Sequence, residues 1–233
     1  MKKYFLFDLD GTLTDPGVGI TNSVAYALKS YGITVEDRTS LYSFIGPPLK
    51  ESFERFYGFS PEQADEAVGK YREYFGEKGL MENKAYDGIL PMLEELKGKG
   101  AKLLVATSKT TCFAREILEH FGMLSCFEFV AGSNLDGSRV KKDEVIAYAL
   151  QEMGICCLEE AVMIGDREHD IIGAKKCGIS SIGVLYGYGS REELEKHGAD
   201  RIVESVGELR TRLLSEAEAS RQGDPVREET DEA

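Results

Sequence analysis

The stretch "YFLFDLDGTLTD", residues Tyr4 to Asp15, decides the fold of this chain. It begins with an apolar run that is typical of a buried strand and ends in two carboxylates, Asp8 and Asp10, followed by Gly11. Residues i and i+2 of an extended chain point to the same side, so two like charges lie together at the edge of the core. Because a buried pair of carboxylates cannot stay ionised without a positive partner, we expect a cation to bind there.

Beyond residue 86 the sequence alternates between helical and strand-like segments, which indicates parallel strands joined by helical crossovers. We therefore predict an α/β fold with a doubly wound, mostly parallel sheet. The expected strands after the first are 101–108, 127–132, 161–165, 180–185 and 200–205, and the expected helices are 90–100, 110–122, 141–154, 169–178, 190–198 and 206–214.

Residues 16–82 differ from this pattern, because they lack strand-like runs and show helical periodicity. One helix is predicted to begin at Ser60, where Pro61 and Gln63 complete a capping box. We predict an all-helical cap domain at 16–82, inserted into a core domain formed by 1–15 and 83–214, with hinges near 15–17 and 82–86. The acidic segment 215–233 is predicted to be a disordered tail.

The composition excludes several classes of partner. The chain has 28 Lys+Arg against 41 Asp+Glu, a net charge of -13, so a nucleic-acid polymer or an anionic membrane surface is not expected to bind. The apolar run Tyr4–Phe7 is too short for a signal peptide or a membrane span, so we expect a cytoplasmic protein, either a monomer or a small homo-oligomer. The five cysteines form no C-x-x-C pair and are expected to be reduced thiols.

Polar residues also follow the later strands or begin the next helix. They are Thr107, Ser108 and Lys109, Lys141 and Lys142, and Asp166 and Asp170. The carboxyl ends of parallel strands meet at one edge of a sheet, so these side chains are expected to converge on Asp8 and Asp10. A cluster of carboxylates suits Mg²⁺, and lysines with a hydroxyl suit a phosphate beside it. A carboxylate next to a phosphoryl group can attack it and form an aspartyl-phosphate.

The segments "DLDGT", the strand that ends at Thr107, the basic residue before "DEVIAYAL", and "GDREHD" resemble the four motifs of the haloacid dehalogenase-like (HAD) hydrolase superfamily, over residues 1–214. The resemblance implies that Asp8 is the nucleophile and that Asp10 is the general acid/base, ligating the metal through its backbone carbonyl. It also implies that Thr107 and Ser108 bind the phosphoryl group. Asp166 would ligate Mg²⁺, with Asp170 in the outer shell. The phosphate-binding lysine is Lys141 or Lys142; Lys142 is favoured because it directly precedes "DEVI".

The helical insert resembles the cap of the phosphoglycolate phosphatase-like branch, which includes bacterial 5'-nucleotidase-like proteins. This resemblance implies that the cap selects the substrate through Gly46, Pro47, Pro48 and Lys50. The expected function is Mg²⁺-dependent hydrolysis of a small phosphomonoester, such as a nucleoside 5'-monophosphate. Phosphoglycolate hydrolysis, sugar phosphomutase activity and a catalytically silent phosphate-binding module remain alternatives. The loop "YGYG", residues 186–189, is interpreted as a wall of the site or a platform for a base.

Overall fold

Parallel strands form a six-stranded sheet at the centre of the core domain, in the order β5-β4-β1-β6-β7-β8. The computed structural model describes residues 2–221. The strands are β1 (Tyr4–Phe7), β4 (Lys102–Thr110), β5 (Phe129–Ser133), β6 (Ala161–Gly165), β7 (Ser180–Val184) and β8 (Arg201–Val203). Strand β1 lies between β4 and β6, so that Leu6 is in register with Leu104 and Met163. The predicted doubly wound α/β fold is therefore confirmed.

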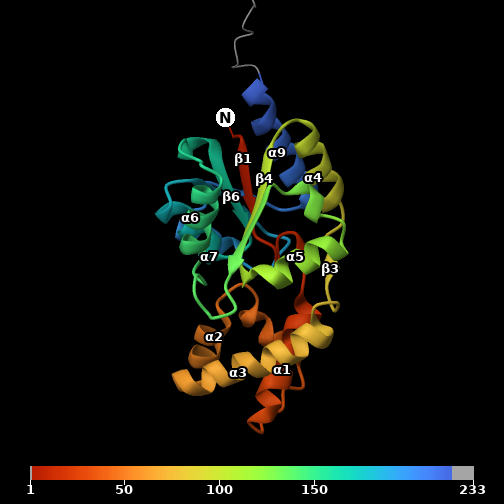
Figure 1. Cartoon of the computed structure of the whole chain (residues 1–233), viewed down its shortest axis with the longest axis vertical. Coiled ribbons are helices and arrows are strands. Elements are labelled where there is room, and N and C mark those ends of the chain that lie inside the picture. Colours follow the sequence, from red (N-terminus) through yellow and green to blue (C-terminus); the bar gives the residue numbers. More distant parts are fainter. Residues whose placement is uncertain (1, 222–233) are drawn as a thin grey trace, which may run out of the picture.

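Helices cover both faces of this sheet (Figure 1). Helices α4 (Ile89–Gly98), α5 (Thr111–His120) and α9 (Val206–Arg221) cover one face, and α6 (Lys142–Glu152) and α7 (Glu168–Lys176) cover the other; α8 (Arg191–His197) follows β7. The alternation of side chains along β1 explains the two layers. Phe5 and Phe7 belong to the hydrophobic cluster with α4, α5 and α9, whereas Leu6 belongs to the cluster with α6 and α7. Short 3-10 turns, η3 (Leu124–Cys126) and η4 (Leu158–Glu160), complete the core domain.

A helical cap lies at the carboxyl end of the sheet (Figure 1). It contains α1 (Gly17–Ser30), the 3-10 helix η1 (Arg38–Phe44), α2 (Leu49–Tyr57), α3 (Pro61–Tyr74) and the π-helical turn η2 (Phe75–Gly79). Helix α3 begins at the predicted capping box: Ser60 Oγ accepts a bond from the Gln63 backbone N–H, and the Ser60 N–H donates to Gln63 Oε1. The cap and the polar strand ends therefore face each other.

The two linkers between core and cap pair with each other. Strand β2 (Thr14–Asp15) and strand β3 (Lys84–Ala85) form a short antiparallel ladder, in which Thr14 is opposite Ala85. The sequence predicted hinges at these positions but not the pairing, because the partners are far apart in the chain. The ladder fixes where the two linkers enter and leave the cap.

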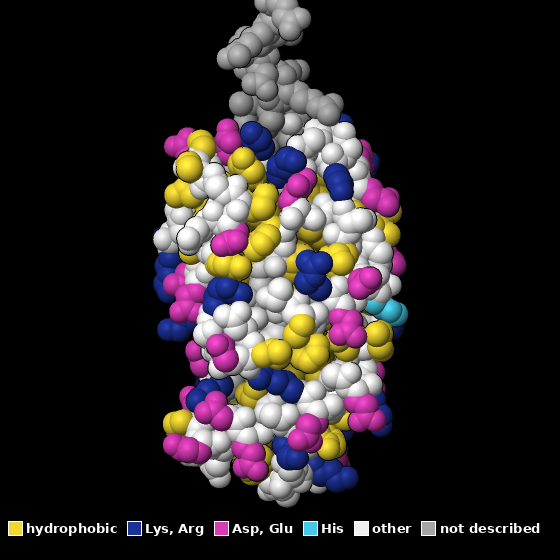
Figure 2. Space-filling model, in the orientation of Figure 1, with side chains coloured by type: hydrophobic (Ala, Val, Ile, Leu, Met, Phe, Trp, Pro, Cys, Tyr) yellow, Lys and Arg dark blue, Asp and Glu magenta, His cyan; other side chains and the backbone are white. Residues whose placement is uncertain are grey.

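Helix α9 continues to Arg221. The prediction of a disordered tail from residue 215 is therefore wrong for residues 215–221, and the rest of that tail, 222–233, lies outside the described residues. Within 2–221, no helix has both the length and the apolar character that a membrane span requires. Figure 2 shows Lys and Arg side chains interspersed with Asp and Glu over the visible face of both domains.

Candidate active site

Lys142 joins two aspartates at the carboxyl edge of the sheet. Its Nζ lies 2.8 Å from Asp8 Oδ1 and 2.9 Å from Asp170 Oδ1, and it donates to the carbonyl oxygen of Ala106 at 3.1 Å. Lys142 is the first residue of α6, where a cation is unfavourable unless an anion is near. Burial alone would lower the pKa of Lys142, but Asp170 and Asp8 raise it above its ordinary value, so the side chain remains charged.

Three carboxylates form a buried group that we call the three-aspartate cluster: Asp8, Asp166 and Asp170. Their oxygens lie within 4.8 Å of one another. Burial and then the charges of Asp170 and Asp8 raise the pKa of Asp166 well above its usual range. Burial also raises the pKa of Asp170 to about 6, although Lys142 opposes this effect. Lys142 alone therefore does not neutralise the cluster, and these two carboxyl groups favour the protonated form unless a further cation is bound.

The residues present fit a hard divalent cation. Asp166 Oδ1 is buried and has no hydrogen-bond partner in the described part of the chain. Carboxylate oxygens are the ligands that Mg²⁺ prefers. The carboxylate of Asp10 does not belong to the cluster, so its expected contribution to metal binding is limited to its backbone carbonyl.

Asp10 instead pairs with Lys109, which was expected among the converging polar residues but without a specific role. Lys109 Nζ lies 2.8 Å from Asp10 Oδ2, with side chains that are 7% and 11% exposed. The same ammonium group lies 4.3 Å from the centre of the Phe75 ring, which belongs to the cap. Burial raises the pKa of Asp10, and Lys109 partly offsets this effect. Because Lys109 also contacts Phe75, the Asp10–Lys109 pair lies at the junction between the core and the cap.

Thr107 and Ser108 lie near the carboxyl end of β4, which continues to Thr110, two residues beyond the predicted strand. Thr107 is buried and its Oγ1 accepts a bond from the Lys109 backbone N–H at 3.2 Å. Ser108 Oγ is buried and lacks a hydrogen-bond partner among residues 2–221. An unpaired buried hydroxyl is costly, so Ser108 is suited to a polar ligand.

Lys141 and Lys142 have different surroundings, although they are neighbours in the chain. Lys141 is exposed and lines a small cavity of about 190 Å³, together with Ser108 and His169. Lys142, the lysine favoured from the sequence, forms an ion pair with Asp8. Burial lowers the pKa of His169, and His169 is not part of the three-aspartate cluster.

A larger cavity of about 550 Å³ separates the core from the cap. On the core side it is lined by Asp10, Ser108 and Lys109, and on the cap side by Gly46, Pro47, Pro48 and Lys50. The structure thus brings the predicted cap residues to the same cavity as Asp10. Its apolar wall includes Val68, Tyr71, Phe75 and Phe113.

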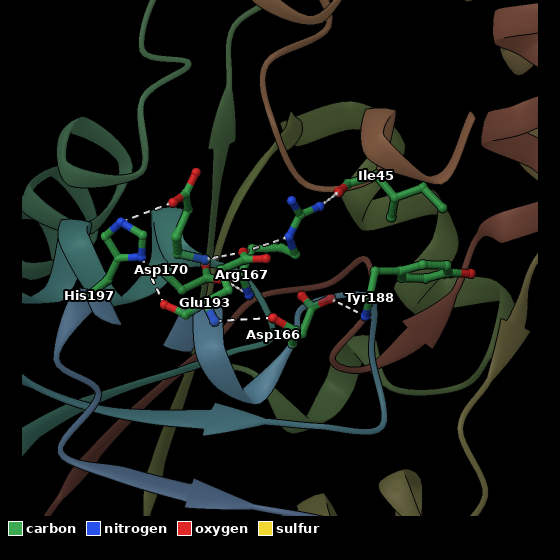
Figure 3. Close-up of polar contacts among 9 residues, drawn as sticks. Ile45, Asp166, Arg167, Asp170, Tyr188, Glu193 and His197 are labelled. Atoms are coloured by element: carbon green, nitrogen blue, oxygen red, sulfur yellow. Dashed lines mark hydrogen bonds and ion pairs between the residues drawn. The ribbon is translucent and has the colours of Figure 1, made fainter. Parts of the chain in front are cut away.

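The loop "YGYG" forms a wall of the site rather than an open platform. The Tyr186 hydroxyl donates to the carbonyl of Thr12 at 3.0 Å, and the Tyr188 hydroxyl donates to Asp15. The Tyr188 backbone N–H donates to Asp166 Oδ2 at 2.7 Å (Figure 3). Gly187 and Gly189 allow this loop to pass close to neighbouring main chain. A Cβ on Gly189 would lie 1.8 Å from the Asp166 carbonyl oxygen.

Arg167 is a second residue without an assigned role that contacts the site. Its backbone N–H donates to Asp170 Oδ2, while its guanidinium points to the carbonyl of Ile45 in the cap (Figure 3). The only signal in the sequence is its position inside "GDREHD", which does not reveal a contact with a segment 122 residues earlier.

Comparisons with known proteins show which proteins this chain is similar to. The family model for haloacid dehalogenase-like hydrolases matches residues 5–184. A 5'-nucleotidase of Pseudomonas aeruginosa is 49% identical over 210 residues, covering 90% of this chain and 95% of the relative. Tyrosine-protein kinase PtkA of Mycobacterium tuberculosis is 40% identical over 210 residues, covering 89% of this chain and 71% of the relative. The crystal structure of a predicted phosphatase from Clostridium acetobutylicum superimposes with a TM-score of 0.90 at 52% identity, covering 92% of this chain and 99% of the other.

Proposed function

Because the chain belongs to the haloacid dehalogenase-like hydrolase family and has phosphatases among its relatives, we propose that it is a Mg²⁺-dependent phosphatase that hydrolyses nucleoside 5'-monophosphates through an aspartyl-phosphate. The observation that carries the proposal is the position of Asp8. Its carboxylate pairs with Lys142 and lies within 4.8 Å of oxygens of Asp166 and Asp170, at the edge of the sheet that faces the cap.

Asp8 is the nucleophile in this proposal. Its Oδ1 accepts the Leu9 backbone N–H and is paired with Lys142, each at 2.8 Å, so Oδ2 is the oxygen that we assign to the attack. Oδ2 forms a bond to phosphorus while the bond from phosphorus to the ester oxygen breaks. Lys142 reduces the repulsion between the carboxylate and the phosphoryl oxygens.

Asp10 gives a proton to the departing ester oxygen and then takes a proton from water. That water attacks phosphorus, the bond to Asp8 Oδ2 breaks, and inorganic phosphate leaves. A raised pKa suits both halves, because an acid/base group works best when its pKa is close to the working pH. Asp10 Oδ1 is buried and has no hydrogen-bond partner among the residues that the structure describes, and we assign it to proton transfer.

Asp8, Asp166 and Asp170, with the backbone carbonyl of Asp10, are the residues that would hold Mg²⁺. When bound, Mg²⁺ neutralises their charge and orients the phosphoryl group. Thr107 and Ser108 bind phosphoryl oxygens in this scheme, and the free Ser108 hydroxyl supports that role.

The size and lining of the larger cavity favour a nucleotide over phosphoglycolate. A nucleoside can fill much of the 550 Å³, and the rings of Phe75 and Phe113 offer it an apolar wall. Phosphoglycolate would need a free cation for its carboxylate. Two cations in the cavity wall are already engaged: Lys50 with Asp65 at 2.7 Å, and Arg72 with the Leu135 carbonyl at 2.9 Å.

A panel of phosphate esters, assayed by released phosphate with Mg²⁺ and with EDTA, tests the proposal. Nucleoside 5'-monophosphates should give the highest kcat/KM, and Asp8→Asn should abolish turnover while the circular dichroism spectrum is unchanged. Preference for phosphoglycolate would overturn the substrate assignment. Dependence on a sugar bisphosphate would indicate a phosphomutase, and phosphate binding without turnover of any ester would indicate a silent binding module. The same panel should include ATP, and phosphotyrosine formation on protein should be measured as well as released phosphate. The two readouts separate hydrolysis from the tyrosine kinase activity for which the mycobacterial relative is named.

A further inference from the structure

Two backbone N–H groups orient two carboxylates of the three-aspartate cluster. The Arg167 N–H donates to Asp170 Oδ2 at 3.1 Å, and the Tyr188 N–H donates to Asp166 Oδ2 at 2.7 Å. Hydrogen bonds from main-chain N–H groups to a carboxylate are strong and directional. The directions of Asp166 and Asp170 therefore depend on where the main chain of residues 167 and 188 is held.

The side chain of Arg167 holds that residue against the cap. Its Nη1 donates to the carbonyl of Ile45, and its Nε lies 2.9 Å from Glu193 Oε1 (Figure 3). Glu193 also accepts the Glu168 backbone N–H at 2.8 Å, so the carboxylate is tied to the start of α7. The Arg167 side chain is only 14% exposed, so solvent screens these contacts less than it would screen a surface pair. Arg167 thus joins the cap, the start of α7 and Asp170.

Gly46 allows this contact from the cap side. Its φ is +102°, a conformation that favours glycine, and an added Cβ would lie 2.8 Å from Arg167 Cγ. The family resemblance implies that Gly46 faces the substrate from the cap. The structure adds that its missing side chain makes room for Arg167.

Tyr188 holds the other carboxylate in the same way. Its hydroxyl donates to Asp15, which lies on the linker strand β2, and its ring packs edge-on against Tyr42 of the cap with centroids 5.3 Å apart. Asp166 and Asp170 therefore each accept a hydrogen bond from the backbone N–H of a residue whose side chain contacts the cap or its linker.

We propose that Arg167 and Tyr188 are positioning residues that couple the closed position of the cap to the alignment of Asp166 and Asp170. When the cap leaves, the two side chains lose their partners and the main chain that orients the carboxylates is released. Coupling of two equilibria is reciprocal, so a divalent cation on the cluster also favours the closed cap. This inference rests on the proposed function, because it takes the cluster to be a metal site.

Isothermal titration of the full-length protein with Mg²⁺ measures the first half of the coupling. Arg167→Ala and Tyr188→Phe should each weaken Mg²⁺ binding about fivefold or more, which is the usual range of an allosteric coupling. Both substitutions leave the backbone N–H groups in place, so a loss of affinity reports the lost side-chain contact, with the cap for Arg167 and with the linker for Tyr188, and not the loss of a ligand. At saturating Mg²⁺ the kcat of each variant should recover toward that of the parent protein.

Hydrogen exchange of residues 38–48 measures the second half of the coupling, which is the effect of Mg²⁺ on the closed position of the cap. In the parent protein Mg²⁺ should slow exchange in this cap segment, and in Arg167→Ala this effect should be smaller. The matched control is Arg191→Ala, because Arg191 is the first residue of α8, a helix that contacts α7. Its side chain is 48% exposed and, within the described chain, forms ion pairs only with exposed Glu195 and Glu204. This variant should bind Mg²⁺ and exchange like the parent.

Unchanged Mg²⁺ affinity in both variants, with faster exchange of the cap segment, would overturn the coupling while leaving the proposed function intact. Failure of the parent protein itself to bind Mg²⁺ would overturn the proposed function first. Gly46→Ala provides a second route that changes no core residue. It should displace Arg167 and weaken Mg²⁺ binding like Arg167→Ala, whereas Arg167→Lys, which keeps the charge, should restore part of the affinity.

Discussion

Lys142 Nζ lies 2.8 Å from Asp8 Oδ1, in an ion pair whose side chains are 3% and 4% exposed. Burying two charges is expensive, but removing one of them leaves the other without compensation. Removing either partner alone should therefore destabilise the fold as well as impair the proposed reaction.

Lys142→Ala should lower the free energy of unfolding by about 3 kcal/mol in EDTA at pH 7.5, because Asp8 and Asp170 would stay buried without their cation. Turnover should fall by at least about a hundredfold, the cost of losing one preorganised charge beside a reacting group. Urea denaturation and phosphate release measure the two effects. Lys141→Ala is the control: Lys141 is exposed, so its stability should change by no more than about 0.5 kcal/mol. Equal losses in both variants would contradict the assignment of Lys142.

The metal-free protein should become less stable as pH rises through about 6. Burial raises the pKa of Asp170 to about 6 and also raises that of Asp166, so the folded state holds protons that the unfolded chain has released. These groups contribute stability that is fully present below their unfolded pKa and is lost as pH rises through the folded pKa.

Mg²⁺ should restore that stability, and more so at pH 7.5 than at pH 5, because its ligands must be deprotonated. At about 100 times its Kd it should stabilise the protein by about 2.7 kcal/mol. Thermal denaturation with Mg²⁺ and with EDTA at both pH values is the measurement. Asp166→Asn should remove most of the difference, and an equal gain at the two pH values would argue against carboxylate ligands.

Lys109→Met tests the pair at the junction of core and cap. It keeps the apolar stem against Phe75 but removes the charge that lowers the pKa of Asp10, so this pKa should rise further. Asp10 would then be protonated over a wider range, and its work as a base in the second half-reaction would slow. In a plot of kcat against pH, the acidic limb should therefore move to higher pH. Lys102→Met, near the other end of β4 and paired with Glu128, should leave the profile unchanged.

The sequence predicted what depends on local pattern. The alternation of segments gave the sheet, the box Ser60–Gln63 gave the start of α3, and polar residues at strand ends gave Asp8, Asp10 and Asp166. These signals are local because periodicity, capping and strand termination each involve a few consecutive residues.

What the sequence could not predict depends on contacts between distant segments. The pairing of β2 with β3, the grip of Arg167 on Ile45 and the contact of Lys109 with Phe75 join segments that only the folded cap brings together. The choice between Lys141 and Lys142 is of the same kind. It depends on which side of the first turn of α6 faces Asp8, which the residue pattern alone left open.

Gly189→Ala should uncouple the site from the fold without touching a side chain that binds substrate or metal. The new Cβ would lie 1.8 Å from the Asp166 carbonyl oxygen, so the main chain beside Asp166 must move. A displacement of about 1 Å in a reacting group can cost about a hundredfold in rate, and we expect a loss of that size together with weaker Mg²⁺ binding. Gly69→Ala is the control, because among residues 2–221 no atom outside the adjoining turns of α3 lies within 4 Å of its added Cβ, and alanine favours a helix by about 0.5–1 kcal/mol. It should raise the melting temperature and keep full activity. A Gly189→Ala protein with normal Mg²⁺ affinity and turnover would show that the loop can move without disturbing Asp166.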